Sequence, residues 1–252
     1  MRLDGRHALI TGGGRGIGRA IAAALTQAGA IVTVVGRGEG ALREAVAAGD
    51  ATGCAVADVT DQPALKRQME AAEATRGPIA ILVNNAGSVE SGPFANTDTA
   101  VFDSMWKVHV MGAVHAIQCV LPGMAARGFG RIINIASTAG LKGYPFVTAY
   151  CAAKHALIGL TRALAKETAS RGVTVNAVCP GYTDTDLVRQ SIERVAGKTK
   201  RAEAEVLAEY VKETPIRRLI RPQEVAAAVL YLCTPDAAAV TGATLAVAGG
   251  EL

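Results

Sequence analysis

The sequence predicts an α/β fold built as a doubly wound parallel sheet of about seven strands with helices on both faces. Short apolar runs alternate along the 252 residues with longer, Ala-rich stretches of helical periodicity. The runs are rich in β-branched residues and lack polar alternation, which is typical of parallel strands covered on both faces. Because no composition break or Pro/Gly/Ser-rich linker divides the chain, we expect a single domain over residues 1–252.

The predicted elements follow one another in a regular order. The strands are expected at residues 7–11, 31–35, 53–57, 79–84, 131–136, 173–178 and 244–248. The helices are expected at residues 17–28, 41–48, 62–75, 101–124, 149–170 and 222–233. In such folds ligands bind at the carboxyl ends of the strands, so the residues that follow each strand are the candidates for a site.

Residues 182–221 interrupt this rhythm. The segment is long, charged and helix-prone, and it contains no predicted strand. Its composition suits either a linker or an inserted lid. Because a strand follows it, we expect a substrate lid.

Composition excludes several classes of protein. The net charge of +4 comes from dispersed Lys and Arg without a basic arm, so we expect no nucleic-acid partner. The first residues lack the apolar core of a signal peptide, and no run of about 18 apolar residues occurs, so we expect no membrane partner. The five cysteines are scattered without metal-ligand spacing, which predicts free thiols, no metal site and a reducing, cytoplasmic location.

A glycine-rich stretch, TGGGRGIG at 11–18, lies between the first predicted strand and the first helix. Gly12, Gly16 and Gly18 permit a tight turn and close approach of the backbone to a ligand. The helix that follows offers free N–H groups and the positive end of its dipole to a pyrophosphate. A glycine-rich turn without a ligand is the alternative, but the strand–turn–helix context favours dinucleotide binding.

The residues after the second strand bear on which dinucleotide binds. NAD enzymes usually place an acid there on the adenosine ribose, whereas this chain has Gly36–Arg37. Arg37, with Arg15 from the glycine turn, could pair with a 2′-phosphate. Two solvated arginines are the alternative reading. The placement favours NADP(H), while Glu39 keeps NAD(H) open.

Polar residues follow the third and fourth strands as well. Asp58 could accept a hydrogen bond from the adenine amino group, although alone it would be interpreted as a helix cap. The sequence NNAG at 84–87 ends the fourth strand. Its two Asn residues suit a turn, and at this edge they can also bond a cofactor.

Tyr150 and Lys154 stand out in the apolar stretch AYCAAKHALIGL at 149–160. On a helix, a spacing of four places both side chains on one face. Ser137 follows the fifth strand and reaches the same edge of the sheet. Such a pair is common by chance and a lone Ser is usually a cap, so the prediction depends on the ordered set: glycine turn, Asn-Asn, Ser137, then Tyr150-x-x-x-Lys154.

This ordered set resembles the short-chain dehydrogenase/reductase family of the single-domain, Rossmann-like type. The resemblance runs from TGGGRGIG through NNAG, the Ser and Tyr-x-x-x-Lys motifs and NAVCPG to the closing GG at 249–250. It implies an enzyme that moves a hydride between NAD(P) and a carbonyl or alcohol carbon. It also implies a homotetramer.

The resemblance implies a role for each catalytic residue. Tyr150 would give its proton to the carbonyl oxygen, and Ser137 would orient that oxygen. Lys154 would bind the nicotinamide ribose. A phenol keeps its proton up to about pH 10, so Lys154 and an oxidised nicotinamide are expected to lower the pKa of Tyr150.

The resemblance also implies a set of cofactor contacts. The backbone of Thr183 and the hydroxyl of Thr185 would lie near the carboxamide of the nicotinamide. The residues that match the family's contacts are Gly12, Arg15, Gly16, Ile17, Gly18, Arg37, Asp58, Val59, Asn85, Tyr150, Lys154, Pro180, Thr183 and Thr185.

His109 is a departure from the family pattern. Relatives usually have an Asn there that supports a water in a proton relay, whereas this chain reads KVHVMG. Imidazole donates and accepts hydrogen bonds and titrates near neutrality, so His109 could serve the relay. A His that fills space in the core, or altered catalysis, are the alternatives.

The substrate is less constrained. Between 187 and 201 five cations face one acid, Glu193, which fits either a solvated helix face or attraction of an anionic substrate; the cations are Arg189, Arg194, Lys198, Lys200 and Arg201. Tyr144, Pro145 and Phe146 could line an apolar pocket.

Within the family, the motifs look most like 3-hydroxybutyrate dehydrogenases and ketoreductases. This implies a 3-oxoacyl or 3-hydroxyacyl thioester linked to CoA or a carrier. An NAD-dependent dehydrogenase of a free 3-hydroxy acid, or of a cyclic or aryl secondary alcohol, is the alternative. A non-catalytic, cofactor-binding scaffold on the same fold is a third.

Overall fold

The computed structural model describes residues 3–212 and 214–252, apart from the side chain of residue 198, and within them it has one sheet of seven parallel strands. The strand order is β3-β2-β1-β4-β5-β6-β7. The strands are β1 His7–Thr11, β2 Ile31–Gly36, β3 Gly53–Val56, β4 Ile79–Asn84, β5 Gly130–Ile135, β6 Val173–Pro180 and β7 Thr244–Val247. The predicted doubly wound sheet is confirmed.

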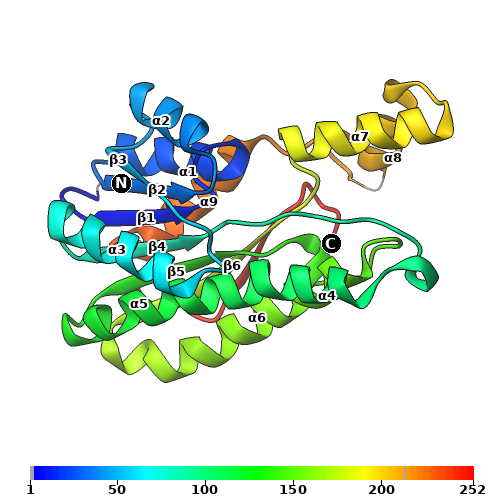
Figure 1. Cartoon of the computed structure of the whole chain (residues 1–252). Helices are drawn as coiled ribbons and strands as arrows, with labels where there is room; N and C mark the ends of the chain where they lie inside the picture. Colours follow the sequence, from blue (N-terminus) through cyan, green and yellow to red (C-terminus); the bar gives the residue numbers. More distant parts are fainter. Residues whose placement is uncertain (1–2, 213) are drawn as a thin grey trace.

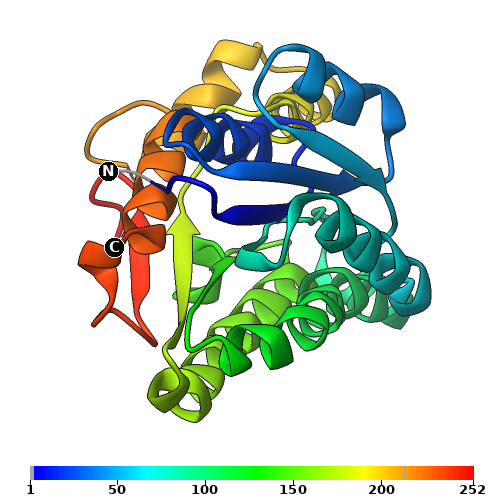
Figure 2. The ribbon, with the colours of Figure 1, turned by 90° about the vertical axis from the view of Figure 1, so that its left-hand side faces the viewer.

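Helices cover both faces of this sheet (Figures 1 and 2). One core cluster joins the sheet to α3, α5 and α6, and another joins its opposite face to α1 and α9. The α-helices are α1 Gly16–Gln27, α2 Glu39–Ala47, α3 Gln62–Arg76, α4 Thr99–Trp106, α5 Gly112–Ala126, α6 Thr148–Thr168, α7 Asp186–Thr199, α8 Glu203–Lys212 and α9 Pro222–Cys233. Short 3₁₀ turns lie at Phe94–Asn96, Thr138–Gly140, Ala169–Arg171 and Pro235–Ala237.

The strand order reverses beside β1, and this reversal marks where a ligand crevice is expected. The chain runs outward from β1 through β2 to β3, and then returns to β4 on the other side of β1. At such a switch point the connections leave in opposite directions and open a crevice at the carboxyl ends of the strands. Thr11 and Asn84 end the two central strands there.

The helix predicted at 101–124 is interrupted. It runs as α4, then a π-helical turn at Lys107–Met111, then α5. The turn inserts an extra residue, so that Gly112 N–H donates to Lys107 O. The sequence carried no signal for it.

The same stretch, Thr99–Ala126, is long and apolar enough to cross a membrane by length and composition. In this fold α4 packs on α6, and α5 packs on β4 and α3. These contacts are those of a helix in the protein core, and a core helix can be as long and as apolar as a membrane span.

Within 182–221, the described residues 182–212 and 214–221 form a helical hairpin that projects from the layered body (Figure 1). Its helices α7 and α8 share a small core of Ile192, Ala196 and Val206. At its base Thr183 and Ile220 form an isolated β-bridge, so the two ends of the segment lie side by side.

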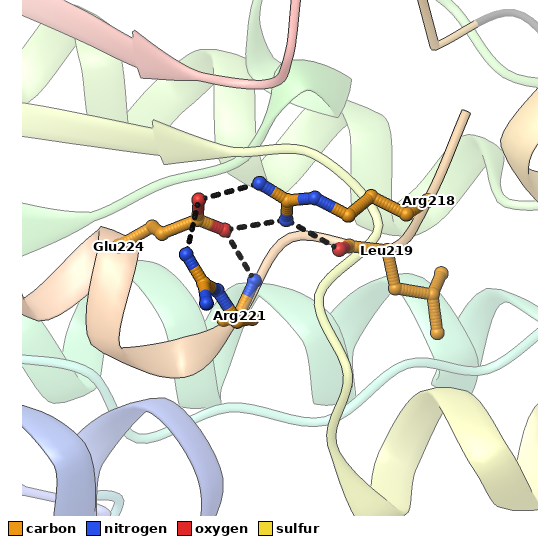
Figure 3. A network of polar contacts seen from close by, with 4 residues as sticks. All are labelled: Arg218, Leu219, Arg221 and Glu224. Carbon is orange, nitrogen blue, oxygen red and sulfur yellow. Dashed lines mark hydrogen bonds and ion pairs between the residues drawn. The ribbon is translucent and has the colours of Figure 1, made fainter. Parts of the chain in front are cut away.

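An ion-pair network fixes the chain just after this bridge (Figure 3). Arg218 makes two hydrogen bonds to the Glu224 carboxylate, both 2.7 Å long. The backbone N–H of Arg221 donates to the same carboxylate over 2.8 Å. These contacts connect the end of the hairpin to the first turn of α9.

Candidate active site

The glycine turn leaves no room for larger side chains. A Cβ on Gly12, whose φ is +66°, would lie 2.9 Å from Asn85 Nδ2 and from the backbone of Ala86. A Cβ on Gly18 would collide with Gly12 O. Arg15 precedes α1, its side chain makes no capping hydrogen bond, and Ile17 follows in the first turn. Free N–H groups at the start of this helix, behind a closely folded turn, fit a dinucleotide pyrophosphate.

Asn85 shapes this turn from the neighbouring strand. Its Nδ2 donates to Thr11 O over 3.0 Å and to Gly12 O over 3.1 Å. Both amide protons are thus used within the protein. Asn85 has only its carbonyl oxygen left for a cofactor, so its main observed contribution is to hold β1 and β4 together.

The end of β2 carries exposed positive charge. The Arg37 side chain is 79% exposed, and its Nη1 lies 3.8 Å from Asp58 Oδ2. Burial opposes ionisation of Asp58, but hydrogen bonds from Thr60 and the charge of Arg37 outweigh it and hold the pKa of Asp58 below its ordinary value. Glu39, the residue that leaves NAD(H) open, is paired with Arg43.

Val59 is held in place by α5. His115 Nδ1 donates to Val59 O over 2.9 Å, and a Cβ on Gly112 would lie 2.7 Å from Val59 Cγ2. Neither His115 nor Gly112 was predicted to support the site, because nothing in the sequence relates a helix residue to a loop more than fifty positions earlier.

Ser137, Tyr150 and Lys154 come together at the carboxyl edge of the sheet. Tyr150 lies close enough to Ser137 for this side chain to lower its pKa, and Ser137 Oγ accepts from Ala139 N over 3.1 Å. Lys154 Nζ donates to Ile135 O over 2.7 Å and lies 5.6 Å from the centre of the Tyr150 ring. This juxtaposition is what a proton transfer to a bound carbonyl requires.

Burial raises the pKa of Tyr150 to about 12 in the nucleotide-free protein, and Ser137 lowers it only partly. The expected lowering of this pKa by a bound, oxidised nicotinamide stays a prediction. Burial also lowers the pKa of Lys154 to about 7. Desolvation disfavours the charged form of each group and is the largest cause of both shifts.

The expectation that His109 titrates near neutrality is wrong. Burial, and then the charge of Lys154, lower the pKa of His109 to about 3. Its Nε2 lies 2.7 Å from Ser88 O, so Nε2 carries the proton and donates. Nδ1 is therefore an acceptor, and it is buried without a partner among the described residues. The imidazole edge meets the Tyr150 ring at 5.3 Å between centres.

A small cavity lies between His109 and Lys154. It offers about 10 Å³ to the centre of a water molecule and is also lined by Thr11, Val59 and Asn84. Asn84 Oδ1 is a second buried acceptor without a partner in the described chain. Lys154 can donate here and two groups can accept, which is a polar environment that suits one ordered water.

A buried chain of hydrogen bonds holds Asn84, which lines this cavity. Asn84 Nδ2 donates to Asn134 Oδ1 over 2.9 Å, and Asn134 Nδ2 donates to Thr161 Oγ1 over 2.8 Å. The chain connects β4, β5 and α6. Asn134 and Thr161 were not among the predicted site residues, because single polar residues in apolar runs give no sign that they face one another.

The loop after β6 lies opposite the glycine turn. Pro180 ends β6, and Thr183 Oγ1 donates to Gly181 O over 2.9 Å. A Cβ on Gly16 would lie 3.1 Å from Thr185 Cγ2, so this loop and the glycine turn are adjacent. The Thr185 hydroxyl caps α7 by accepting from Val188 N, which competes with its expected contact to a carboxamide.

The cations of the 187–201 stretch are partly neutralised. Arg189 forms two hydrogen bonds with Asp184, and Arg201 pairs with Glu205 and Glu209. The side chain of Lys198 lies outside the described residues. The predicted five-to-one excess of positive charge therefore overstates the local field.

Comparisons with known proteins agree with this geometry. The model of the short chain dehydrogenase family matches residues 6–196. The chain is 42% identical to 2-(S)-hydroxypropyl-CoM dehydrogenase 3 of Xanthobacter autotrophicus, over 99% of this chain and 97% of that protein. It is 37% identical to an acetoacetyl-CoA reductase of Rhizobium meliloti, over 98% of each chain.

A solved structure is similar throughout. Actinorhodin polyketide ketoreductase, crystallised as a variant with NADPH, superposes with a TM-score of 0.93 at 36% identity, over 98% of this chain and 97% of that one. These proteins are oxidoreductases, and the chain is one as well, acting on secondary alcohols or ketones with NAD(P)(H). The family match, the relatives and the fold together show that the chain belongs to the short chain dehydrogenase family.

Proposed function

We propose that this enzyme is an NADP(H)-dependent ketoreductase of 3-oxoacyl thioesters, carried by CoA or a carrier, that also runs in reverse on 3-hydroxyacyl thioesters. The observation that carries the proposal is that Ser137, Tyr150 and Lys154 meet at one sheet edge, with Lys154 Nζ 5.6 Å from the centre of the Tyr150 ring. That group lies on the same sheet edge as the glycine turn. A carbonyl oxygen placed between the two hydroxyls would receive a proton from Tyr150 while Ser137 holds it in line.

The high pKa of Tyr150 suits a general acid. NADPH bound in the crevice would supply the hydride to the carbonyl carbon. With a pKa of about 12, Tyr150 keeps its proton at neutral pH and could donate it to the carbonyl oxygen.

Lys154 and the cavity beside it would return the proton. A lysine with a pKa of about 7 exchanges protons readily near neutrality. His109 Nδ1 and Asn84 Oδ1 are placed to hold a water next to it. His109 would then position this water as a neutral acceptor, and its own charge state would not change during turnover.

The preference for NADP(H) rests on three features of the β2 end. Arg15 and Arg37 are both exposed and near the start of α2. No side chain caps α2, whose N-cap is Gly38. Glu39 is held by Arg43 and leaves the ribose site open to a phosphate. The remaining matched contacts, among them Ile17, Val59, Thr183 and Thr185, would line the rest of the dinucleotide.

The thioester assignment is supported by one relative and by exposed charge. The acetoacetyl-CoA reductase is named for a coenzyme A thioester, whereas the hydroxypropyl-CoM of the other relative is a thioether on an anionic carrier. Arg194 and Lys200 are exposed on the hairpin, which would act as a substrate lid and attract an anionic carrier.

We also propose a cytoplasmic homotetramer. The edge strand β7 leaves Leu245 exposed, and an uncovered edge strand is a ready pairing surface. Sedimentation analysis tests this assembly: a tetramer is expected, and a monomer at micromolar concentration contradicts it.

A steady-state screen tests the proposed function. Acetoacetyl-CoA, free acetoacetate and cyclic ketones are each compared with NADPH and NADH. We expect the highest kcat/KM for acetoacetyl-CoA with NADPH. A preference for NADH with a free acid would overturn the substrate and the cofactor together. Nucleotide binding without turnover of any compound would favour a non-catalytic scaffold.

A further inference from the structure

The C-terminal tail, Gly249–Glu251, is built into the base of the hairpin. Ile216 N donates to Gly249 O over 3.3 Å. A Cβ on Gly249 would lie 2.9 Å from Thr214 Cγ2 and would collide with the Ile216 side chain, and one on Gly250 would lie 3.0 Å from Pro215 Cγ. Both glycines have positive φ, +61° and +86°. The tail therefore fits closely against the segment that leaves the hairpin.

Glu251 extends from this tail to the loop that follows Ser137. Its side chain is only 1% exposed, and its Oε1 lies 3.1 Å from Lys142 Nζ. The same oxygen is hydrogen-bonded to the Tyr144 hydroxyl. Tyr144 is also hydrogen-bonded to Thr138 Oγ1 over 2.7 Å. Since Thr138 directly follows Ser137, the carboxylate is linked to the catalytic Ser through the side chains of Tyr144 and Thr138.

The second carboxylate oxygen faces the cofactor loop. Glu251 Oε2 is buried and has no hydrogen-bond partner among the described residues. A Cβ on Gly181 would lie 2.8 Å from it, so Glu251 packs against the loop that begins at Pro180. The Tyr144 ring meets Tyr182 edge-on at 6.1 Å between centres, and Tyr182 meets Tyr210 of α8 at 4.6 Å.

We propose that Glu251 is a positioning residue for the reaction. Its carboxylate holds the Ser137–Tyr144 loop, the Pro180–Thr183 loop and the hairpin in one arrangement, so that the carbonyl of the substrate is seated between Ser137 and Tyr150. Burying a carboxylate is costly, and an apolar side chain would anchor a tail at least as well. What the carboxylate adds is direction, through hydrogen bonds to Tyr144 and Lys142. The inference rests on the proposed function.

Kinetics of a double-mutant cycle test this role. Glu251→Ala and Tyr144→Phe should each lower kcat/KM for acetoacetyl-CoA about tenfold, with the Kd of NADPH within about twofold of wild type. Because both residues act through one hydrogen bond, the double variant should also lose about tenfold and not about a hundredfold. Glu251→Gln keeps an acceptor for Tyr144 and should recover activity to within about threefold of wild type.

A second measurement needs no turnover. Hydrogen exchange of the nucleotide-free protein should speed up in peptides covering 138–146 and 203–212 in Glu251→Ala. It should not change in Leu252→Ala, because that neighbouring side chain is 54% exposed. If the wild-type protein reduces no ketone, the proposed function fails. The exchange data still test whether Glu251 holds the loop and the hairpin in place.

Three outcomes would overturn the role. The first is a hydrogen-exchange rate in Glu251→Ala that equals that of wild type. The second is a loss of kcat/KM in the double variant that equals the product of the two single losses. The third is an increase in exchange in Leu252→Ala as large as that in Glu251→Ala.

Discussion

The catalytic edge of the sheet and the 182–221 hairpin are built in opposite ways. At the edge, Ser137 and Lys154 are fixed by hydrogen bonds to the backbone, beside the Tyr150 ring. On the hairpin, charged side chains pair with neighbours on the surface, as Arg201 does with Glu205 and Glu209. Buried polar contacts hold one geometry, whereas exposed ion pairs contribute little and rearrange easily. The proposed function places the chemistry in the first region and substrate choice in the second.

Removal of the proposed proton donor at the catalytic edge should have the largest effect on turnover. Tyr150→Phe should lower kcat by about two to four orders of magnitude, the usual contribution of a general acid. The Kd of NADPH, measured by nucleotide fluorescence, should stay within about twofold. Tyr231→Phe on α9, a partly exposed tyrosine, is the matched control. Substantial residual turnover in Tyr150→Phe would remove this residue as the donor.

A charge change at the β2 end should have the next largest effect. Arg37→Ala should weaken NADPH binding by about 1.5–3 kcal/mol, the contribution of a hydrogen bond to a charged group. Binding of NADH, which lacks the 2′-phosphate, should hardly change. Titration of both nucleotides checks this, with Arg171→Ala as the exposed control. Equal losses for the two nucleotides would argue against a phosphate contact.

The pH dependence of stability tests the buried His109. Its pKa is about 3 in the folded protein, against an ordinary value of 6.5 for a solvated histidine. Between these values the unfolded chain binds a proton that the native protein excludes, so stability falls as the pH drops through this window. From pH 7 to pH 5 the loss attributable to His109 should be about 2 kcal/mol.

Denaturant unfolding at the two pH values measures this loss. It should shrink in His109→Asn and persist in His155→Asn, where the histidine is exposed. An identical loss in wild type and His109→Asn would mean that His109 is protonated in the folded protein.

Charge removal on the hairpin should have the smallest effect. Arg194→Ala and Lys200→Ala should raise the KM for acetoacetyl-CoA about two- to threefold at low salt and less at high salt, as expected for screened surface charge. The KM for an uncharged cyclic ketone should not respond. A salt-independent increase with both substrates would point to a structural role for these residues.

The contrast between the two regions also explains what could be predicted from the sequence. Glycines at a strand-to-helix turn and a Tyr-x-x-x-Lys spacing are local patterns, so Gly18, Tyr150 and Lys154 were placed correctly on their elements. The parallel sheet followed from strand composition in the same way. These features depend on a few neighbouring residues.

Features that depend on tertiary packing could not be predicted. The π-helical turn that carries His109 has no local pattern, and the pKa values of Tyr150 and Lys154 depend on how deeply the fold buries them. The pairing of Arg201 with Glu209, eight residues away, changes the net charge that a shorter window suggested. The contact of Glu251 with Tyr144 spans 107 positions.

The hydrogen-bonded chain of Asn84, Asn134 and Thr161 has a practical consequence for engineering. These hydrogen bonds set the spacing of β4, β5 and α6, and they involve no residue of the surface loops. A hairpin from a distant relative that is grafted at the Thr183–Ile220 bridge should therefore leave the spacing of β4, β5 and α6 unchanged.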